Sequence, residues 1–225
     1  MQREAVIAAV AEVRRDIAAW ASRPGVRLCA VTKGFAVDAI RAARDAGCDA
    51  VGENYAQELL GKMITLGDEP RPEVHFIGRI QSNKVRALAP HVTAWQSVDR
   101  PSVIAEIGRR APAATRVMIQ VNTTGEPGKS GCSPGDVGVL VAAARTHGLI
   151  VDGVMTMGPT SQDPDATRAA FALARRIADE HGFVACSMGM SGDLRIALEE
   201  GSTLVRVGTR LFGQRPVAPL SSGVL

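Results

Sequence analysis

The chain has 225 residues, of which 46% are hydrophobic and 22% are charged, as in an ordinary soluble globular protein. Its formal net charge is only +3 and its Lys and Arg residues are dispersed, so nothing indicates a nucleic-acid partner. No apolar stretch approaches the length of a transmembrane helix, which argues against a membrane protein. We expect one domain over residues 1–225, because α/β barrels of this length form a single unit.

The start of the chain and its cysteines favour a cytoplasmic protein. The first residues lack the uninterrupted apolar core of a secretion signal, and Glu4, Glu12 and Asp16 argue against a transit peptide. The four cysteines form no CxxC pair and do not cluster with the four histidines, so no metal site is expected. Reduced thiols in the cytoplasm are the simplest interpretation.

Apolar residues near the N-terminus recur at spacings of three and four, which predicts an amphipathic helix over residues 3–21. Charged residues lie off this stripe, and Pro24 with Gly25 ends the helix. The apolar stripe consists of Val6, Val10, Val13, Ile17 and Trp20.

From residue 27 onward, short runs rich in Val and Ile alternate with amphipathic helical stretches, which indicates βαβ units and a parallel sheet. Eight runs without a break in rhythm favour a single closed (β/α)8 TIM-type barrel over residues 27–214, rather than an open doubly wound sheet. We expect the extra N-terminal helix to cover the wall left bare by a missing eighth helix, and residues 215–225 to form a flexible tail. The runs are 27–32, 50–53, 74–78, 94–98, 115–121, 150–157, 183–188 and 203–207.

Lys33 directly follows the first apolar run and precedes Gly34, so it lies at the C-terminal end of a strand. Barrel enzymes place their active sites at that end. A lysine in partly apolar surroundings has a lowered pKa and is a usable amine nucleophile, the usual route to a Schiff base with an aldehyde. The alternative is a structural lysine whose ammonium reaches solvent past the strand end.

Other polar residues end neighbouring strands. Asn54 follows the second run, while His75 lies within the third and faces the same side as Ile77. Arg206 lies in an otherwise apolar strand, where a guanidinium is either paired with a carboxylate or directed at a ligand.

Glycine-rich turns follow the last two strands, at residues 188–193 and at Gly208-Thr209. Loops after the seventh and eighth strands commonly bind phosphate in barrels, because free N–H groups there form an anion site. The alternative for the first turn is that Ser191 only caps its own helix. An aldehyde-capturing lysine, a phosphate cradle and an arginine together suit pyridoxal 5′-phosphate (PLP).

Several motifs in order, from about residue 27 to 214, resemble those of the pyridoxal phosphate homeostasis proteins. These are single-domain relatives of the alanine racemase N-terminal barrel, PLP fold type III. The motifs are Ala30-Val31-Thr32-Lys33, Gly52-Glu53-Asn54-Tyr55, the run from His75 to Lys84, Val121-Asn122 with Lys129-Ser130-Gly131, Ser187-Met188-Gly189-Met190-Ser191 and Val205-Arg206-Val207-Gly208-Thr209.

The resemblance implies that Lys33 carries PLP as an internal aldimine and that Arg206 faces the pyridine nitrogen. It also implies that Ser191, Gly208 and Thr209 hold the phosphate. Lys84 and Lys129 match the family pattern, and we interpret them as solvated or rim charges. The implied cofactor-binding residues are Lys33, Asn54, His75, Met188, Ser191, Arg206, Gly208 and Thr209, with no catalytic residue and no metal.

The same residues bear on whether the protein is a carrier or a catalyst. Arg206 only donates hydrogen bonds, so the pyridine nitrogen stays unprotonated and the ring is a weak electron sink. A two-base racemase needs an acid or base opposite Lys33, and Tyr55 is the single tyrosine of the chain. We therefore expect a PLP-binding protein, a monomer or weak dimer, that buffers the cofactor or delivers it to apo PLP enzymes.

Two alternatives remain open from the sequence. One is a PLP-dependent amino-acid racemase that uses Tyr55 or His75 as its second base. The other is a barrel enzyme that acts on a sugar phosphate through a Schiff-base lysine. Such lysines commonly lie on a late strand, whereas Lys33 is on the first.

Overall fold

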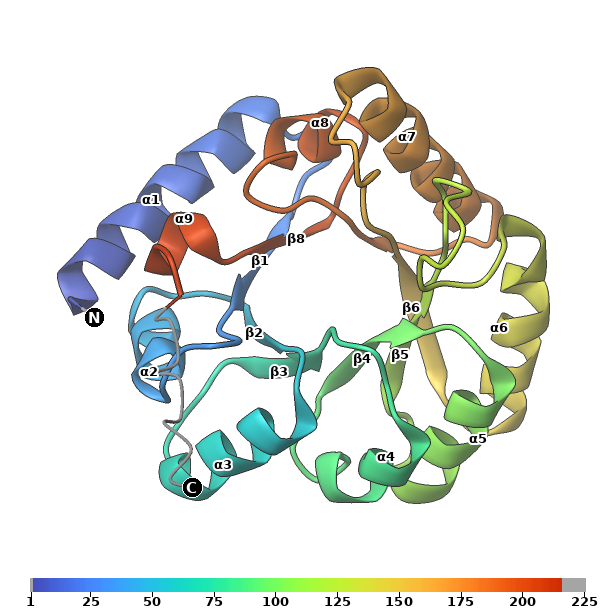
Figure 1. Cartoon of the computed structure of the whole chain (residues 1–225), viewed down its shortest axis with the longest axis horizontal. Coiled ribbons are helices and arrows are strands. Elements are labelled where there is room, and N and C mark those ends of the chain that lie inside the picture. The colour runs from blue at the N-terminus through green and yellow to red at the C-terminus, as the bar shows by residue number, and fades with distance from the viewer. Residues whose placement is uncertain (1, 216–225) are drawn as a thin grey trace, which may run out of the picture.

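The computed structural model describes residues 2–215, and eight parallel strands close into a barrel in the order β1 to β8 (Figure 1). The closed barrel predicted from the sequence is thereby confirmed, in preference to an open sheet. The strands are β1 (Arg27–Val31), β2 (Ala50–Glu53), β3 (Glu73–Phe76), β4 (Ala94–Val98), β5 (Arg116–Gln120), β6 (Ile150–Met155), β7 (Ala185–Ser187) and β8 (Leu204–Val207).

The helices form a ring outside the barrel (Figure 1). They are α1 (Arg3–Trp20), α2 (Asp38–Asp45), α3 (Ala56–Leu66), α4 (Ser82–Leu88), α5 (Pro101–Arg110), the 3-10 turn η1 (Pro134–Asp136), α6 (Val137–Thr146), α7 (Pro164–Glu180), α8 (Leu194–Glu199) and α9 (Thr209–Phe212).

The N-terminal helix α1 covers the barrel wall as predicted. It lies between α8 and α2 in Figure 1 and contacts both of them, together with the short α9 that follows β8. Its buried residues are Val6, Val10, Val13 and Ile17, which are the apolar stripe without Trp20. Apart from Arg215, the predicted tail 215–225 lies outside the described residues.

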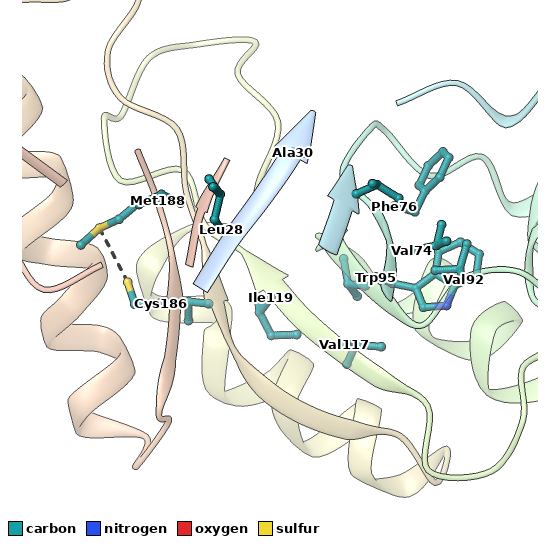
Figure 2. Close-up of a cluster of buried hydrophobic side chains, with 14 of the residues drawn as sticks. Leu28, Ala30, Val74, Phe76, Val92, Trp95, Val117, Ile119, Cys186 and Met188 are labelled. Carbon is teal, nitrogen blue, oxygen red and sulfur yellow. Dashed lines mark hydrogen bonds between the residues drawn. The ribbon is translucent and has the colours of Figure 1, made fainter. Parts of the chain in front are cut away.

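Alternation along each strand decides which side chains face the interior of the barrel and which face the helices. The outward set includes Leu28, Val74, Phe76 and Trp95, which are buried between the strands and the helices (Figure 2). A second, smaller cluster of buried apolar residues consists of Cys29, Ala50, Met118, Met155 and Leu204. Since Cys29 alternates with Leu28 and Ala30, this second cluster fills the barrel interior.

Strand β7 is shorter than predicted, starting at Ala185 rather than near residue 183. The reason is the end of the preceding helix, because the Phe183 N–H donates to the Ala178 carbonyl at 2.7 Å and closes the last turn. All four cysteines are buried free thiols. Among the helices of residues 2–215, none combines the length and the apolar composition that crossing a bilayer requires.

Candidate functional site

A cavity of about 230 Å³ opens at the C-terminal ends of the strands, where the sequence predicted the site. It brings together six of the eight predicted residues, from the ends of β1, β2, β7 and β8. Its lining residues are Val31, Lys33, Phe35, Asn54, Ile77, Met155, Met157, Met190, Ser191, Gly192, Arg206, Gly208, Thr209, Gly213 and Arg215.

Lys33 reaches this cavity because it continues the inward-facing set of β1, two residues beyond Val31. Its side chain is half-buried, and within residues 2–215 it has no ion-pair or hydrogen-bond partner. Burial lowers the pKa of Lys33, and the nearby cations Arg215 and Arg206 lower it further. A neutral amine is therefore more accessible here than at a solvated lysine, which is what a nucleophilic lysine requires.

The backbone that carries Lys33 is held by a buried ion cluster. The next residue, Gly34, has φ of +77°, a conformation that favours glycine, and its N–H donates to Glu58 Oε1 at 2.6 Å. Lys62 Nζ donates to the Thr32 carbonyl at 2.8 Å and to Glu58 Oε1 at 2.6 Å. The same ammonium lies 2.5 Å from Glu53 Oε1. Both sides of Lys33 are thus fixed to α3.

Replacing Lys62 by methionine is expected to destabilise the protein by about 3–5 kcal/mol at neutral pH, because the buried Glu53 would lose its cation. Burial raises the pKa of Glu53 even in the wild type, so the Glu53 carboxyl group keeps its proton to a higher pH in the folded state than in the unfolded chain. The destabilisation should therefore grow as pH rises above the usual range of glutamate and shrink in acid.

Urea unfolding of the Lys62→Met protein at several pH values measures this effect. Lys84→Met is the matched control, since Lys84 is half-buried and has no ion pair within residues 2–215. An equal loss of stability at every pH would contradict the role given to Glu53.

Arg206 is buried, yet no carboxylate pairs with it in the described part of the chain. Its NH1 donates to Ser187 Oγ at 2.6 Å and its NH2 to the Thr156 carbonyl at 2.8 Å. The ion-pair alternative raised by the sequence is therefore not what the structure contains. Burial lowers the pKa of Arg206, but an arginine remains a cation and offers five N–H donors, so it has donors to spare for a ligand.

The loops after β7 and β8 present unsatisfied backbone donors beside the cavity. Within residues 2–215 the N–H groups of Ser191, Gly192, Gly208 and Thr209 have no acceptor. Ser191 does not cap α8, because that helix begins at Leu194 with Asp193 as its N-cap residue. Free N–H groups of this kind form an anion site.

Three observations test whether PLP fits the residues present. Asn54 Oδ1 is buried without a hydrogen-bond partner in the described residues, so this oxygen can accept a hydrogen bond from a ligand. Gly192 has open space beside it, since an added Cβ would meet no atom within 4 Å. At Gly208, by contrast, an added Cβ would lie 3.3 Å from Val31, so the backbone of Gly208 packs closely against the end of β1. Together with the lysine and the free N–H groups, these features fit a phosphorylated aldehyde.

Two predicted residues lie outside the cavity. His75 faces inward like Ile77, but two positions along the strand place it about 6.6 Å deeper. It lines a separate cavity of about 240 Å³ with Arg27 and Arg116, at the N-terminal end of the barrel. Met188 faces outward and packs in the outer core, where the Cys186 thiol lies 3.7 Å from its sulfur (Figure 2). For Met188 the sequence did hold a signal, because Met188 alternates with the inward-facing Ser187; the level of His75 depends on the register of β3 in the sheet.

The remaining lining residues were not among the cofactor-binding residues predicted from the sequence. Ile77 and Gly192 follow from alternation and from the glycine-rich turn, whereas nothing in the sequence pattern brings Arg215 beside Gly34. Lys129 Nζ donates to the Gly158 carbonyl at 2.6 Å and thus ties two loops together.

A neighbouring cavity of about 490 Å³ is lined by Tyr55, Arg79 and Lys84 and shares Asn54 with the Lys33 cavity. Tyr55 is 57% exposed and does not line the Lys33 cavity. The single tyrosine of the chain therefore lies beside that cavity rather than in it.

Comparison with known proteins agrees with this geometry. Residues 7–216 match the model of the family described as "Alanine racemase, N-terminal domain". A Pseudomonas aeruginosa protein named pyridoxal phosphate homeostasis protein is 42% identical over 217 residues, which cover 93% of this chain and 94% of that protein.

Solved structures of related proteins are also similar to this chain. PipY of Synechococcus elongatus PCC7942, solved with PLP bound, is 33% identical with a TM-score of 0.80, covering 91% of this chain and 100% of that one. Alanine racemase of Corynebacterium glutamicum shares the fold, with 18% identity and a TM-score of 0.74. The match covers 98% of this chain and only 64% of the racemase. The chain belongs to the alanine racemase N-terminal domain family and, within it, to the pyridoxal phosphate homeostasis proteins.

Proposed function

We propose that this protein binds PLP through Lys33 and serves as a carrier that buffers the cofactor or delivers it to apo PLP enzymes. The observation that carries the proposal is the single cavity in which Lys33, Arg206 and the free N–H groups of two loops converge. Homologues named for PLP homeostasis, and PipY with PLP bound, support the same conclusion.

Each residue has a role that its position supports. Bound PLP would supply an aldehyde and an electron-withdrawing pyridine ring. Lys33 contributes the amine, whose lowered pKa makes the neutral form available. Arg206 donates to the ring nitrogen, and the N–H groups of Ser191, Gly192, Gly208 and Thr209 hold the phosphate. Asn54 accepts from a polar group of the ligand through its unpartnered oxygen.

The composition of the cavity favours a carrier over a racemase. Its lining residues, all within the described part of the chain, include no Tyr, His, Asp, Glu or Cys. Lys33 is therefore the one side chain in the lining able to exchange a proton near neutral pH. A racemase must remove the Cα proton on one face and return it on the other, which requires a second such group.

The test uses the PLP-loaded protein in two measurements. Added to an apo PLP enzyme, it should restore that enzyme's activity, with free PLP at the same total concentration as the reference. Incubated with L-alanine, L-serine and L-lysine in D₂O, it should leave their configuration unchanged. Rapid racemisation of any of the three, lost in Lys33→Ala, would overturn the carrier proposal and make the protein an enzyme.

A further inference from the structure

A continuous series of side-chain hydrogen bonds crosses the barrel interior, and the cofactor-binding proposal does not account for it. Arg206 NH1 lies 2.6 Å from Ser187 Oγ, which lies 2.7 Å from Gln96 Oε1. Gln96 Nε2 lies 2.7 Å from His75 Nδ1, and His75 Nε2 lies 3.1 Å from Glu73 Oε2. These five residues, from four different strands, form what we call the interior network.

With the Gln96 amide oriented as in the structure, Oε1 toward Ser187 and Nε2 toward His75, one placement of protons satisfies the interior network. Arg206 can only donate, so Ser187 Oγ accepts from it and donates its own proton to Gln96 Oε1. The amide nitrogen of Gln96 then donates to His75 Nδ1, which must carry no proton. His75 is therefore neutral, with its proton on Nε2, and all hydrogen bonds run in one direction from Arg206 to Glu73.

We propose that Ser187 and Gln96 are positioning residues for Arg206, and that the neutral, Nε2-protonated form of His75 keeps them in place. A second proton, on Nδ1, would face the amide N–H of Gln96, so the amide would have to turn over. Ser187 Oγ would then accept from both Arg206 and Gln96, and its own proton would lose Gln96 Oε1 as its acceptor. Protonation of His75 would thus loosen Arg206 at the opposite end of the barrel. The inference rests on the proposed function, in which Arg206 faces the ligand.

The charges around His75 favour its neutral form. Glu73 lies on the same strand as His75, and its carboxylate forms ion pairs with Arg27 of β1 at 2.8 Å and with Arg116 of β5 at 2.7 Å. Asp152 of β6 lies 3.6 Å from Arg116. Burial lowers the pKa of His75, the hydrogen bond that His75 donates to Glu73 opposes this effect, and the two arginines lower the pKa further. Acid is therefore needed to add the second proton.

The first test is made on the wild-type protein without PLP, and a variant serves only to assign the signal. Nitrogen-15 NMR of the ligand-free wild type should show His75 protonated on Nε2 and bare on Nδ1 at neutral pH, with the signal assigned by its loss in His75→Gln. A proton on Nδ1 would overturn the proposal. If the wild type failed to bind PLP, the proposed function would fail, whereas this measurement would still decide the proton positions.

Variants test the consequence for binding. Ser187→Ala cuts the interior network and should weaken PLP binding about tenfold at neutral pH, since a hydrogen bond to a charged group is lost. The control is Ser202→Ala, which removes another buried hydroxyl of the same barrel wall, one that donates to the Met188 carbonyl at 2.7 Å. It should lower the melting temperature without changing PLP affinity. Equal PLP affinity in the two variants would overturn the proposal.

The Gln96→Glu variant tests whether Ser187 and Gln96 position Arg206 or only stabilise the fold. A carboxylate accepts from Ser187 with one oxygen and from a protonated His75 with the other, so the network stays intact with His75 charged. NMR should then find both ring nitrogens of His75 protonated at neutral pH. Because Lys33 and the phosphate also titrate, affinities are compared at the same pH. In acid, this variant should bind PLP about tenfold more tightly than the wild type, and no difference in acid would overturn the proposal.

Discussion

Replacing Lys33 by alanine is expected to abolish the covalent attachment of PLP while leaving the barrel folded. Lys33 is the one lysine that lines the cavity, and its half-buried side chain has no partner within residues 2–215. Removing it therefore breaks no ion pair of the described structure, and the melting temperature should change little. Attachment to the wild type should slow as pH falls, because Lys33 must lose a proton even though its pKa is lowered.

Borohydride reduction followed by peptide mapping measures the attachment. The pyridoxyl group should be found on Lys33 in the wild type and be missing from Lys33→Ala. Lys84→Ala is the matched control, since Lys84 is also half-buried but lines the neighbouring cavity. A pyridoxyl group on Lys62, Lys84 or Lys129 of the wild-type protein would show that the attachment site was assigned wrongly.

The phosphate group is expected to carry most of the non-covalent affinity. Four backbone N–H groups of the loops after β7 and β8 lack an acceptor in the described residues, and hydrogen bonds to a charged group contribute about 1.5–3 kcal/mol each. Pyridoxal, which has the same aldehyde without the phosphate, should therefore bind at least about a hundredfold more weakly than PLP.

Equilibrium dialysis of the two compounds tests this expectation. Thr209→Val keeps the main-chain donors and should weaken PLP binding only modestly, whereas Gly208→Val should weaken it strongly. An added Cβ at Gly208 already comes within 3.3 Å of Val31, so the loop would have to shift. Equal retention of pyridoxal and PLP by the wild type would place the phosphate elsewhere.

Much of the site was predictable because strand alternation and strand ends are both local properties. Lys33, Asn54 and Arg206 each occupy an inward position at or near the C-terminal end of a strand, which the sequence pattern reveals directly. The loop residues Ser191, Gly208 and Thr209 followed from their glycine-rich turns. Direction in or out along one strand depends only on counting by two.

Depth within the barrel was not predictable in the same way. His75 has the inward orientation expected of it, but its level is set by the stagger of β3 against β2 and β4, which are its neighbours in the sheet. That stagger places it among Arg27, Arg116 and Glu73 rather than beside Lys33. The outward direction of Met188, by contrast, was predictable, since Met188 alternates with the inward-facing Ser187.

The sequence by itself determined the barrel, the N-terminal helix that closes its wall, and the strand ends at which the chemistry gathers. It could do so because hydrophobic periodicity reports local structure and because strand ends meet on one face of a parallel barrel. Only the tertiary structure decided that Arg206 has no carboxylate partner in residues 2–215, that Arg215 returns to Gly34, and that Ser187, Gln96 and His75 join in one network. Those contacts join residues up to 181 positions apart (Gly34 and Arg215), and their geometry exists only once the sheet has closed.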